Sequence, residues 1–175
     1  NPDVDMFFIN AQHIDVSTLD GMEEPVSSRR FPDDLRTDSK DRVNRVLSSF
    51  DELIDPAKTT SFLTALMCSI FRRSIWMEHS SDVHVARDDF RDVYSTYPHA
   101  IILAKGMRGH PVYWIGEPVL VVGDGVRYWN HDFPMVAQIR YLDLLDTYEA
   151  LGVDPERIDV CRRFVILHNV ARIFY

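Results

Sequence analysis

The stretch "PVYWIGEPVLVVGDGVRYW", residues 111–129, contains three runs of β-branched and aromatic residues separated by turn formers. Such runs, bounded by glycine and proline, are typical of β-strands. "GDG" (123–125) predicts a hairpin turn, because glycine adopts the positive φ angles that tight turns need. "GEP" (116–118) is either a further turn or a bulge within one long bent strand. Together with "HAIILAK" (99–105), the region predicts a small antiparallel meander of three or four strands.

Apolar residues recur at three- and four-residue steps on both sides of this meander, which is the pattern of helices with one buried face. We expect three helices before the meander, over 38–54, 55–77 and 80–97, and two after it, over 134–151 and from 156 towards the C-terminus. Proline directly after Asp55 and Asp154 supports two of these starts, since it fits the first helical position behind a capping side chain. The sequence therefore predicts an α+β fold: about five helices, with the three- to four-stranded antiparallel meander inserted between helices 3 and 4.

The segment 55–77 is expected to be the central helix of the core, because its middle turns carry almost no polar residue. Leu66 and Ile70 have apolar neighbours at every helical angle, so both side chains are predicted to be fully buried. Truncating either side chain to Ala should then cost about 2–5 kcal/mol.

Length and composition predict one folded domain. The chain has 175 residues, of which 46% are apolar and 26% charged, as in globular proteins. Residues 1–36 are expected to form an acidic N-terminal arm or loop before a single α+β domain at 37–175. The longest dense apolar stretch, 62–71, is far shorter than the ~18 residues of a membrane span. The lack of a starting Met and the apolar C-terminal pattern suggest a segment of a longer protein.

The net charge indicates which class of partner the protein binds, and the cysteines indicate its cellular compartment. With 27 acidic and 19 basic side chains the net charge is −8, which argues against binding a phosphate backbone. The pairs Arg72-Arg73 and Arg162-Arg163 are local exceptions, which a solvated helix edge or carboxylate partners would also explain. The two cysteines lie in apolar patterns and suit a reducing intracellular compartment, cytoplasmic or nuclear.

One set of side chains could carry chemistry. If "GEP" is a turn, the strand ends collect two imidazoles and two carboxylates at one edge of the sheet: His99, Glu117, His131 and Asp132. Such a set could bind a divalent metal or perform acid–base chemistry, as in a small metal-dependent hydrolase. The alternative is that these residues merely flank strands, as polar residues commonly do.

Two aromatic pairs form the second candidate site: Tyr113-Trp114 and Tyr128-Trp129. Neighbours along a strand point to opposite faces, so one aromatic of each pair faces away from the inner core. Exposed aromatic side chains of this kind are typical of a partner-binding surface. Alternatively, a later helix or the N-terminal arm covers the second face of the sheet.

No complete nucleophile, nucleotide-binding or metal motif accompanies these residues. We therefore expect a non-catalytic protein–protein interaction domain of a larger intracellular protein, which needs no cofactor. Its expected partner is a protein, including a second copy of the same chain, bound through the aromatic surface of the sheet. The metal-dependent hydrolase is the alternative.

Overall fold

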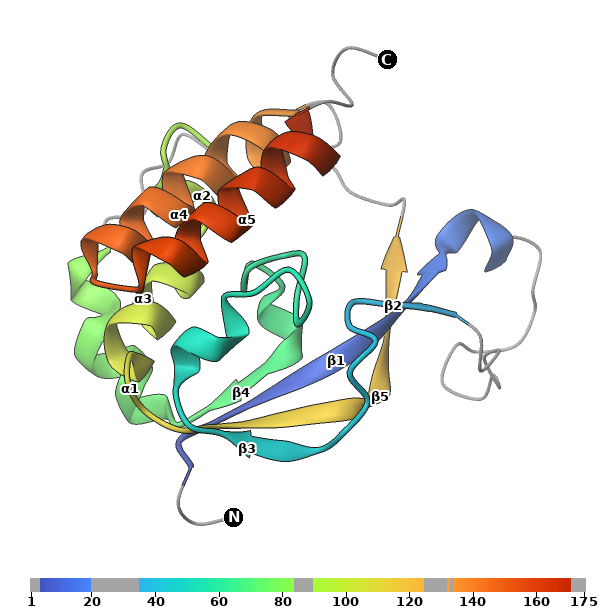
Figure 1. Ribbon diagram of the computed structural model, residues 1–175, viewed down its shortest axis with the longest axis horizontal. Helices are drawn as coiled ribbons and strands as arrows, with labels where there is room; N and C mark the ends of the chain where they lie inside the picture. The colour runs from blue at the N-terminus through green and yellow to red at the C-terminus, as the bar shows by residue number, and fades with distance from the viewer. Residues whose placement is uncertain (1–3, 20–34, 84–89, 125–131, 133, 171–175) are drawn as a thin grey trace.

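The computed structural model describes residues 4–19, 35–83, 90–124, 132 and 134–170, with five α-helices on one face of a curled five-stranded sheet (Figure 1). The strands are β1 (Met6–Asp15), β2 (Arg36–Thr37), β3 (Arg45–Leu47), β4 (Ser69–Phe71) and β5 (Val112–Asp124). The α-helices are α1 (Arg73–His79), α2 (Val93–Thr96), α3 (Pro98–Met107), α4 (Arg140–Ala150) and α5 (Pro155–His168). Short 3₁₀-helices lie at Val16–Leu19, Phe50–Leu53, Leu66–Cys68 and Ser80–Asp82, and a π-helix, Met135–Ile139, precedes α4.

The two long strands, β1 and β5, form the centre of the sheet and run parallel to each other. The strand order is β2-β1-β5-β3, and β4 pairs with the first half of β1 on the same edge that β2 occupies further along. Parallel strands need a long crossover, here almost the whole chain between residues 15 and 112. The predicted antiparallel meander between helices 3 and 4 is therefore wrong, because β5 pairs with the N-terminal strand.

The "GEP" segment is a bulge, not a turn. Ile9 pairs with Ile115 and Ala11 with Leu120, so the single residue Asn10 faces Gly116 to Val119 of β5. The runs 111–115 and 118–122 thus belong to one bent strand, as the second interpretation of "GEP" held. The third run, 126–129, lies outside the described residues.

Asn10 holds this bulge together from inside the molecule. Its amide nitrogen donates to the carbonyl oxygens of Gly116 at 2.9 Å and Ser39 at 3.0 Å. Its side-chain oxygen accepts from the Ser39 amide, also at 3.0 Å. Because the side chain is fully buried, these bonds satisfy polar groups that water cannot reach.

The run 99–105, predicted as a strand, lies in the helix α3, which begins at Pro98. All five residues from Ala100 to Ala104 are buried, so this helix has apolar contacts all round. A fully buried apolar run has no polar positions to show whether its period is that of a helix or of a strand. Its sequence therefore fits either element equally well. The prediction failed for this reason.

The helix predicted over 55–77 is also wrong. Phe62 and Leu63 have φ angles of 47° and 72°, a left-handed conformation that no α-helix of L-residues can contain. Both side chains are fully buried at this turn. The apolar density of the segment thus reflects a buried turn, followed by the edge strand β4 and the helix α1.

Leu66 and Ile70 lie beyond that turn and are 40% and 57% exposed, so the predicted burial of both is wrong. Ile70 belongs to β4 and pairs with Phe7 of β1. Its apolar neighbours in sequence are therefore not its neighbours in space.

The first and third predicted helices are wrong as well. Residues 38–54 form β3 and the 3₁₀-helix Phe50–Leu53, whose N-cap Ser49 accepts a hydrogen bond from the Asp51 amide. Their apolar residues are divided between solvent and core, since Val43 and Val46 are exposed whereas Leu47 and Phe50 are buried. Within 80–97, the described residues show a 3₁₀-helix and α2, and Phe90 has a φ of 64° that prevents one continuous helix.

The two C-terminal helices confirm the prediction. The π-helix and α4 span the predicted segment 134–151, and α5 follows after Gly152, whose φ of 92° closes the first helix. The Asp154 carboxylate accepts from the Glu156 amide and caps α5 as expected. Arg162 of α5 pairs with Asp146 and Glu149 of α4, which ties the two helices together.

The hydrophobic core lies between the helices and the inner face of the sheet, with the segment joining β3 to β4 packed between them (Figure 1). Its largest fully buried side chains include Trp114, Tyr148, Phe8, Phe50 and Phe62. Tyr148 of α4 donates its hydroxyl proton to the Phe62 carbonyl, so even this buried polar atom is paired. No helix among the described residues is long and apolar enough to cross a membrane.

Candidate functional site

The aromatic pair Tyr113-Trp114 is divided between the two faces of β5, as alternation along a strand requires. Trp114 is 0% exposed and stacks on Phe8 with the ring centres 6.1 Å apart. Its indole N–H donates to the Asp41 carbonyl at 3.2 Å, and Lys58 lies over its ring. Trp114 is thus a core residue, which leaves Tyr113 as the member that faces away from the core.

Tyr113 is half-buried on the opposite face, the outer face of the sheet, where its ring lies 5.6 Å from that of Phe7. The second predicted pair, Tyr128-Trp129, lies outside the described residues.

A row of apolar side chains crosses four strands on this outer face. Tyr113 pairs with Phe7 on one side and with Val46 on the other, and Phe7 pairs with Ile70. The next outward position of the two central strands adds the pair Ile9 and Ile115. We call this set the outer stripe; it consists of Ile70, Phe7, Tyr113, Val46, Ile9 and Ile115.

The outer stripe is separate from the hydrophobic core. None of its six residues belongs to the core cluster or packs against it, although Ile9 is largely covered. Val46 and Ile70 at the two ends are 45% and 57% exposed. Figure 1 shows the helices on the opposite face, and no described helix covers the stripe. Phe7, Tyr113 and Ile115, between the two end residues, are partly buried, so the stripe is most exposed at its two ends.

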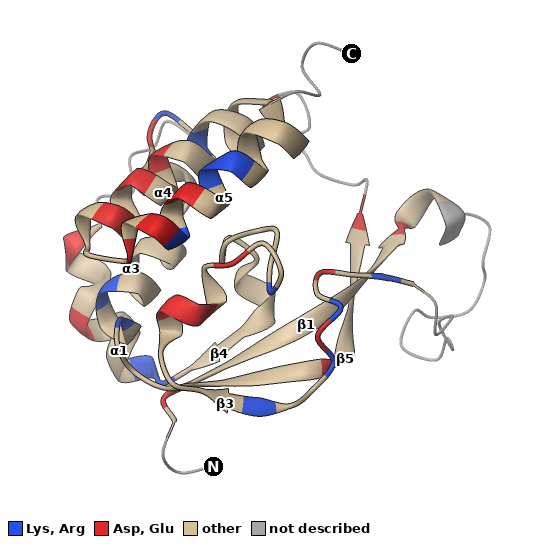
Figure 2. Ribbon diagram, in the orientation of Figure 1, with Lys and Arg blue, Asp and Glu red and all other residues tan. Residues whose placement is uncertain are grey.

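Charged residues border the outer stripe without entering it. Asp5 lies two residues before Phe7, just ahead of β1, and forms an ion pair with Arg72 at the end of β4. Glu117 follows Ile115 on β5 and is exposed. Figure 2 shows β1, β4 and most of β5 with little charge, while acidic and basic residues are concentrated on α4 and α5. The stripe is therefore an apolar surface with a polar border, the usual form of an interface.

Of the six stripe residues, the sequence identified only Tyr113 as a binding residue; the other five are Phe7, Ile9, Val46, Ile70 and Ile115. "MFFI" (6–9) alternates between core and outer positions, but every residue in it is apolar, so no polar face shows on which side the core lies. Val46 and Ile70 were assigned to helices. Only the strand register places these residues beside Tyr113.

The four predicted His and carboxylate residues lie on different elements. His99 is in the first turn of α3, Glu117 is exposed in the middle of β5, Asp132 precedes the π-helix, and His131 lies outside the described residues. The common sheet edge on which their meeting depended is absent, since α3 replaces the first strand. Among the described residues no group of three His, Cys, Asp or Glu side chains could hold a metal ion.

His99 has a structural role. Burial lowers the pKa of its imidazole, which favours the neutral ring, and its Nε2–H donates to the Thr64 carbonyl at 2.9 Å. Burial also raises the pKa of the Cys68 and Cys161 thiols to about 12, so neither is an activated nucleophile.

The basic pairs named from the sequence are partly neutralised by carboxylates. Arg162 contacts Asp146, Glu149 and Asp159, and Arg72 pairs with Asp5. These two guanidinium groups are occupied within the protein, as the carboxylate-partner interpretation predicted.

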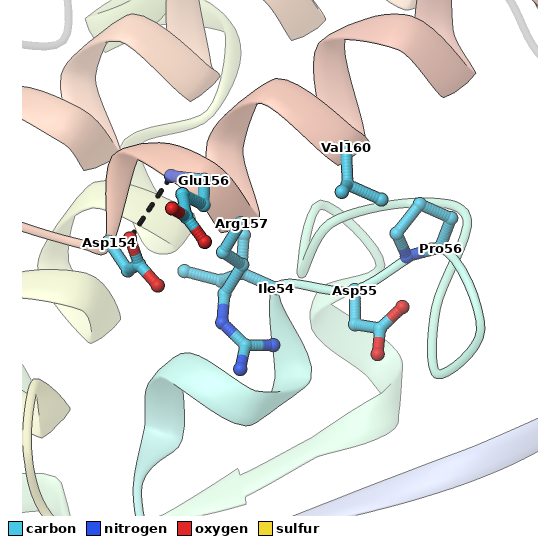
Figure 3. Close-up of a pocket in the computed structure, with 7 residues that line it drawn as sticks. All are labelled: Ile54, Asp55, Pro56, Asp154, Glu156, Arg157 and Val160. Carbon is cyan, nitrogen blue, oxygen red and sulfur yellow. Dashed lines mark hydrogen bonds between the residues drawn. The ribbon is translucent and has the colours of Figure 1, made fainter.

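A shallow pocket of about 300 Å³ lies between α5 and the end of the 3₁₀-helix Phe50–Leu53 (Figure 3). Its lining consists of Ile54, Asp55, Pro56, Asp154, Glu156, Arg157 and Val160. Figure 3 shows the Asp154 carboxylate turned to the Glu156 amide as the helix cap, and the Arg157 side chain extending towards the 3₁₀-helix. The Asp154 side chain is thus engaged in the helix cap, and none of the four charged residues that line the pocket is buried.

Comparisons with known proteins identify no relative: no family model, no curated protein and no solved structure matches the chain.

Proposed function

We propose that the chain is a non-catalytic protein-interaction domain that binds a protein partner through the outer stripe. The observation that carries this proposal is the continuous apolar row Ile70–Phe7–Tyr113–Val46 on the face of the sheet that no described helix covers. Contiguous exposed apolar surface with a polar border is typical of interaction sites. Tyr113 is well suited to anchor a partner, since a rigid aromatic ring buries a large area at little entropic cost.

The partner that fits this surface is an apolar segment flanked by Lys or Arg side chains. The chain carries a net charge of −8, so a second copy meets long-range repulsion whereas a basic partner is attracted. Glu117, which is exposed, adds a local negative charge beside the stripe. Two buried, free cysteines further support an intracellular location for this interaction.

A pair of synthetic amphipathic peptides tests the proposal, one of leucine and lysine and one of leucine and glutamate. The leucine–lysine peptide should bind, and the doubly substituted Val46→Asp/Ile70→Asp protein should bind it tenfold or more weakly, because both residues lie at the stripe. The matched control is Ile166→Asp/Leu167→Asp, which adds the same charge at exposed positions on α5. Isothermal titration calorimetry supplies both dissociation constants.

Equal affinities for the two double variants would contradict the proposal, because binding would then follow charge and not the stripe. Sedimentation equilibrium of the protein alone tests whether a second copy of the chain occupies the stripe instead. A dimer that is lost in the Val46→Asp/Ile70→Asp variant and kept in the α5 variant would assign the stripe to a second copy of the chain.

A further inference from the structure

His13 lies near the end of β1, where three segments of the chain meet. Its Nε2 is 3.0 Å from an Asp38 oxygen, just after β2, and its Nδ1 is 3.2–3.3 Å from both oxygens of Asp124, at the end of β5. Arg36 of β2 in turn donates to Asp124 at 2.8 Å. One imidazole thus connects the ends of β1, β2 and β5.

The arrangement requires the imidazolium form of His13. A carboxylate accepts hydrogen bonds, so each ring nitrogen must carry a proton to bond its partner. A neutral ring has one N–H and would turn the lone pair of its other nitrogen towards a carboxylate. In agreement with this geometry, the hydrogen bond to Asp38 raises the pKa of His13, against burial and the nearby Arg36, which lower it.

Asp124 and Asp38 differ in the cationic partners that they keep when His13 loses its proton. Asp124 keeps its bond to Arg36, a side chain that is 63% exposed. Asp38 is 7% exposed, and its carboxylate has no other cationic partner among the described residues. The thiol of Cys68 is the other titratable group close to Asp38, and that carboxylate raises its pKa further. Within the described part of the chain, Asp38 therefore depends on His13 for its positive charge.

We propose that His13 is a proton-operated latch that holds β2 and Asp38 on the edge of β1. The pairing of β2 with β1 comprises two residue pairs, Gln12 with Thr37 and His13 with Arg36, supplemented by the Asp38 amide, which donates to the Ala11 carbonyl at 3.1 Å. So short a strand has little else to hold it, and loss of the imidazolium removes one of its few charge-assisted contacts. Release of β2 uncovers the β1 edge at Ala11 to Ile14, an edge able to pair with another strand.

The pH dependence follows from the sign of the shift. A group whose pKa is raised on folding stabilises the closed form fully below its ordinary pKa, near 6.5. That contribution is lost as the pH rises through the raised value, so the latch is closed in mild acid and weakens towards alkaline pH. At high pH, the equilibrium constant that favours the closed form is reduced tenfold for each unit by which the pKa of His13 exceeds its ordinary value.

Two measurements on the whole chain test the latch. The ring of His13 should titrate above 6.5 by NMR, and Arg36→Gln should move that titration to higher pH because the opposing cation is removed. The exchange protection of the Asp38 amide, corrected for the intrinsic effect of pH, should fall between pH 6 and pH 9 by the factor that the measured pKa requires. In His13→Gln, which is neutral throughout, the protection should not change over this range.

The proposal is overturned if His13 titrates at or below its ordinary value, or if the protection of the Asp38 amide is independent of pH in the unmodified chain. Should His13→Gln fail to fold, Asp38→Asn serves in its place. It should lower the pKa of His13 and remove the pH dependence of protection, and an unchanged titration in this variant contradicts the proposal equally.

Discussion

The two faces of the sheet differ although the same strands supply both. On the inner face, Trp114 and Phe8 stack within the core and the Trp114 indole N–H is hydrogen-bonded to the Asp41 carbonyl. On the outer face, the adjacent residues Tyr113 and Phe7 also touch, but beside side chains that are half exposed. Aromatic density alone therefore does not separate core from surface. Whether an aromatic residue is buried depends on which elements cover its face of the sheet.

The largest expected effect is the loss of a side chain from the inner face. Trp114→Ala should destabilise the fold by about 3–5 kcal/mol, since it removes a fully buried indole and leaves a cavity. Tyr113→Ala should cost less than Trp114→Ala, because part of the Tyr113 side chain is already in water and it lies outside the core cluster. Denaturant unfolding of the two variants gives both values, and equal losses would show that the two faces are equally buried.

A smaller effect is expected at the bulge that bends the sheet between its two halves. Asn10→Ala should cost about 1–3 kcal/mol, because the Gly116 and Ser39 carbonyls lose their donor inside the protein. Gln12→Ala, two residues along the same strand and only partly buried, is the matched control and should change stability by less than Asn10→Ala does. Similar unfolding free energies for both variants would mean that water reaches the bulge.

The smallest effect is expected on the outer stripe itself. Ile70→Ala should change the unfolding free energy by less than about 1 kcal/mol, because the side chain is more than half exposed on an edge strand. Ile101→Ala on α3, where the same side chain is fully buried, should cost about 2–5 kcal/mol. A thermal or chemical melt of both variants checks the contrast, and a large loss at Ile70 would place the stripe inside a covered interface.

The sequence predicts well those elements whose signals are local. The helices after residue 134 have a polar and an apolar side, a Gly152 stop and an Asp154 cap, and they form as expected. The segments before Met107 lack such contrast. Their apolar residues fit a helical period at 38–54 although Val46 pairs with Tyr113 in a sheet, and α3 shows no period because all its faces are buried.

The parallel pairing of β1 with β5 could not be predicted from either strand alone. The two strands are almost a hundred residues apart, and neither sequence specifies its partner or its register. The candidate site depended on that register. Alternation along β5 correctly predicts that one residue of Tyr113-Trp114 faces outward, but the companions Phe7 and Ile70 are brought to it by strands distant in the chain.

Methyl NMR mapping shows directly which surface of the protein the leucine–lysine peptide contacts. The stripe carries Ile9, Ile70, Ile115 and Val46, and α5 carries exposed Val160, Ile166 and Leu167 for comparison. We predict that shifts upon titration are concentrated on the stripe methyls and saturate together with the calorimetric binding curve. Shifts concentrated on α5, or spread evenly over both sets, would contradict the assignment of the outer stripe as the partner-binding surface.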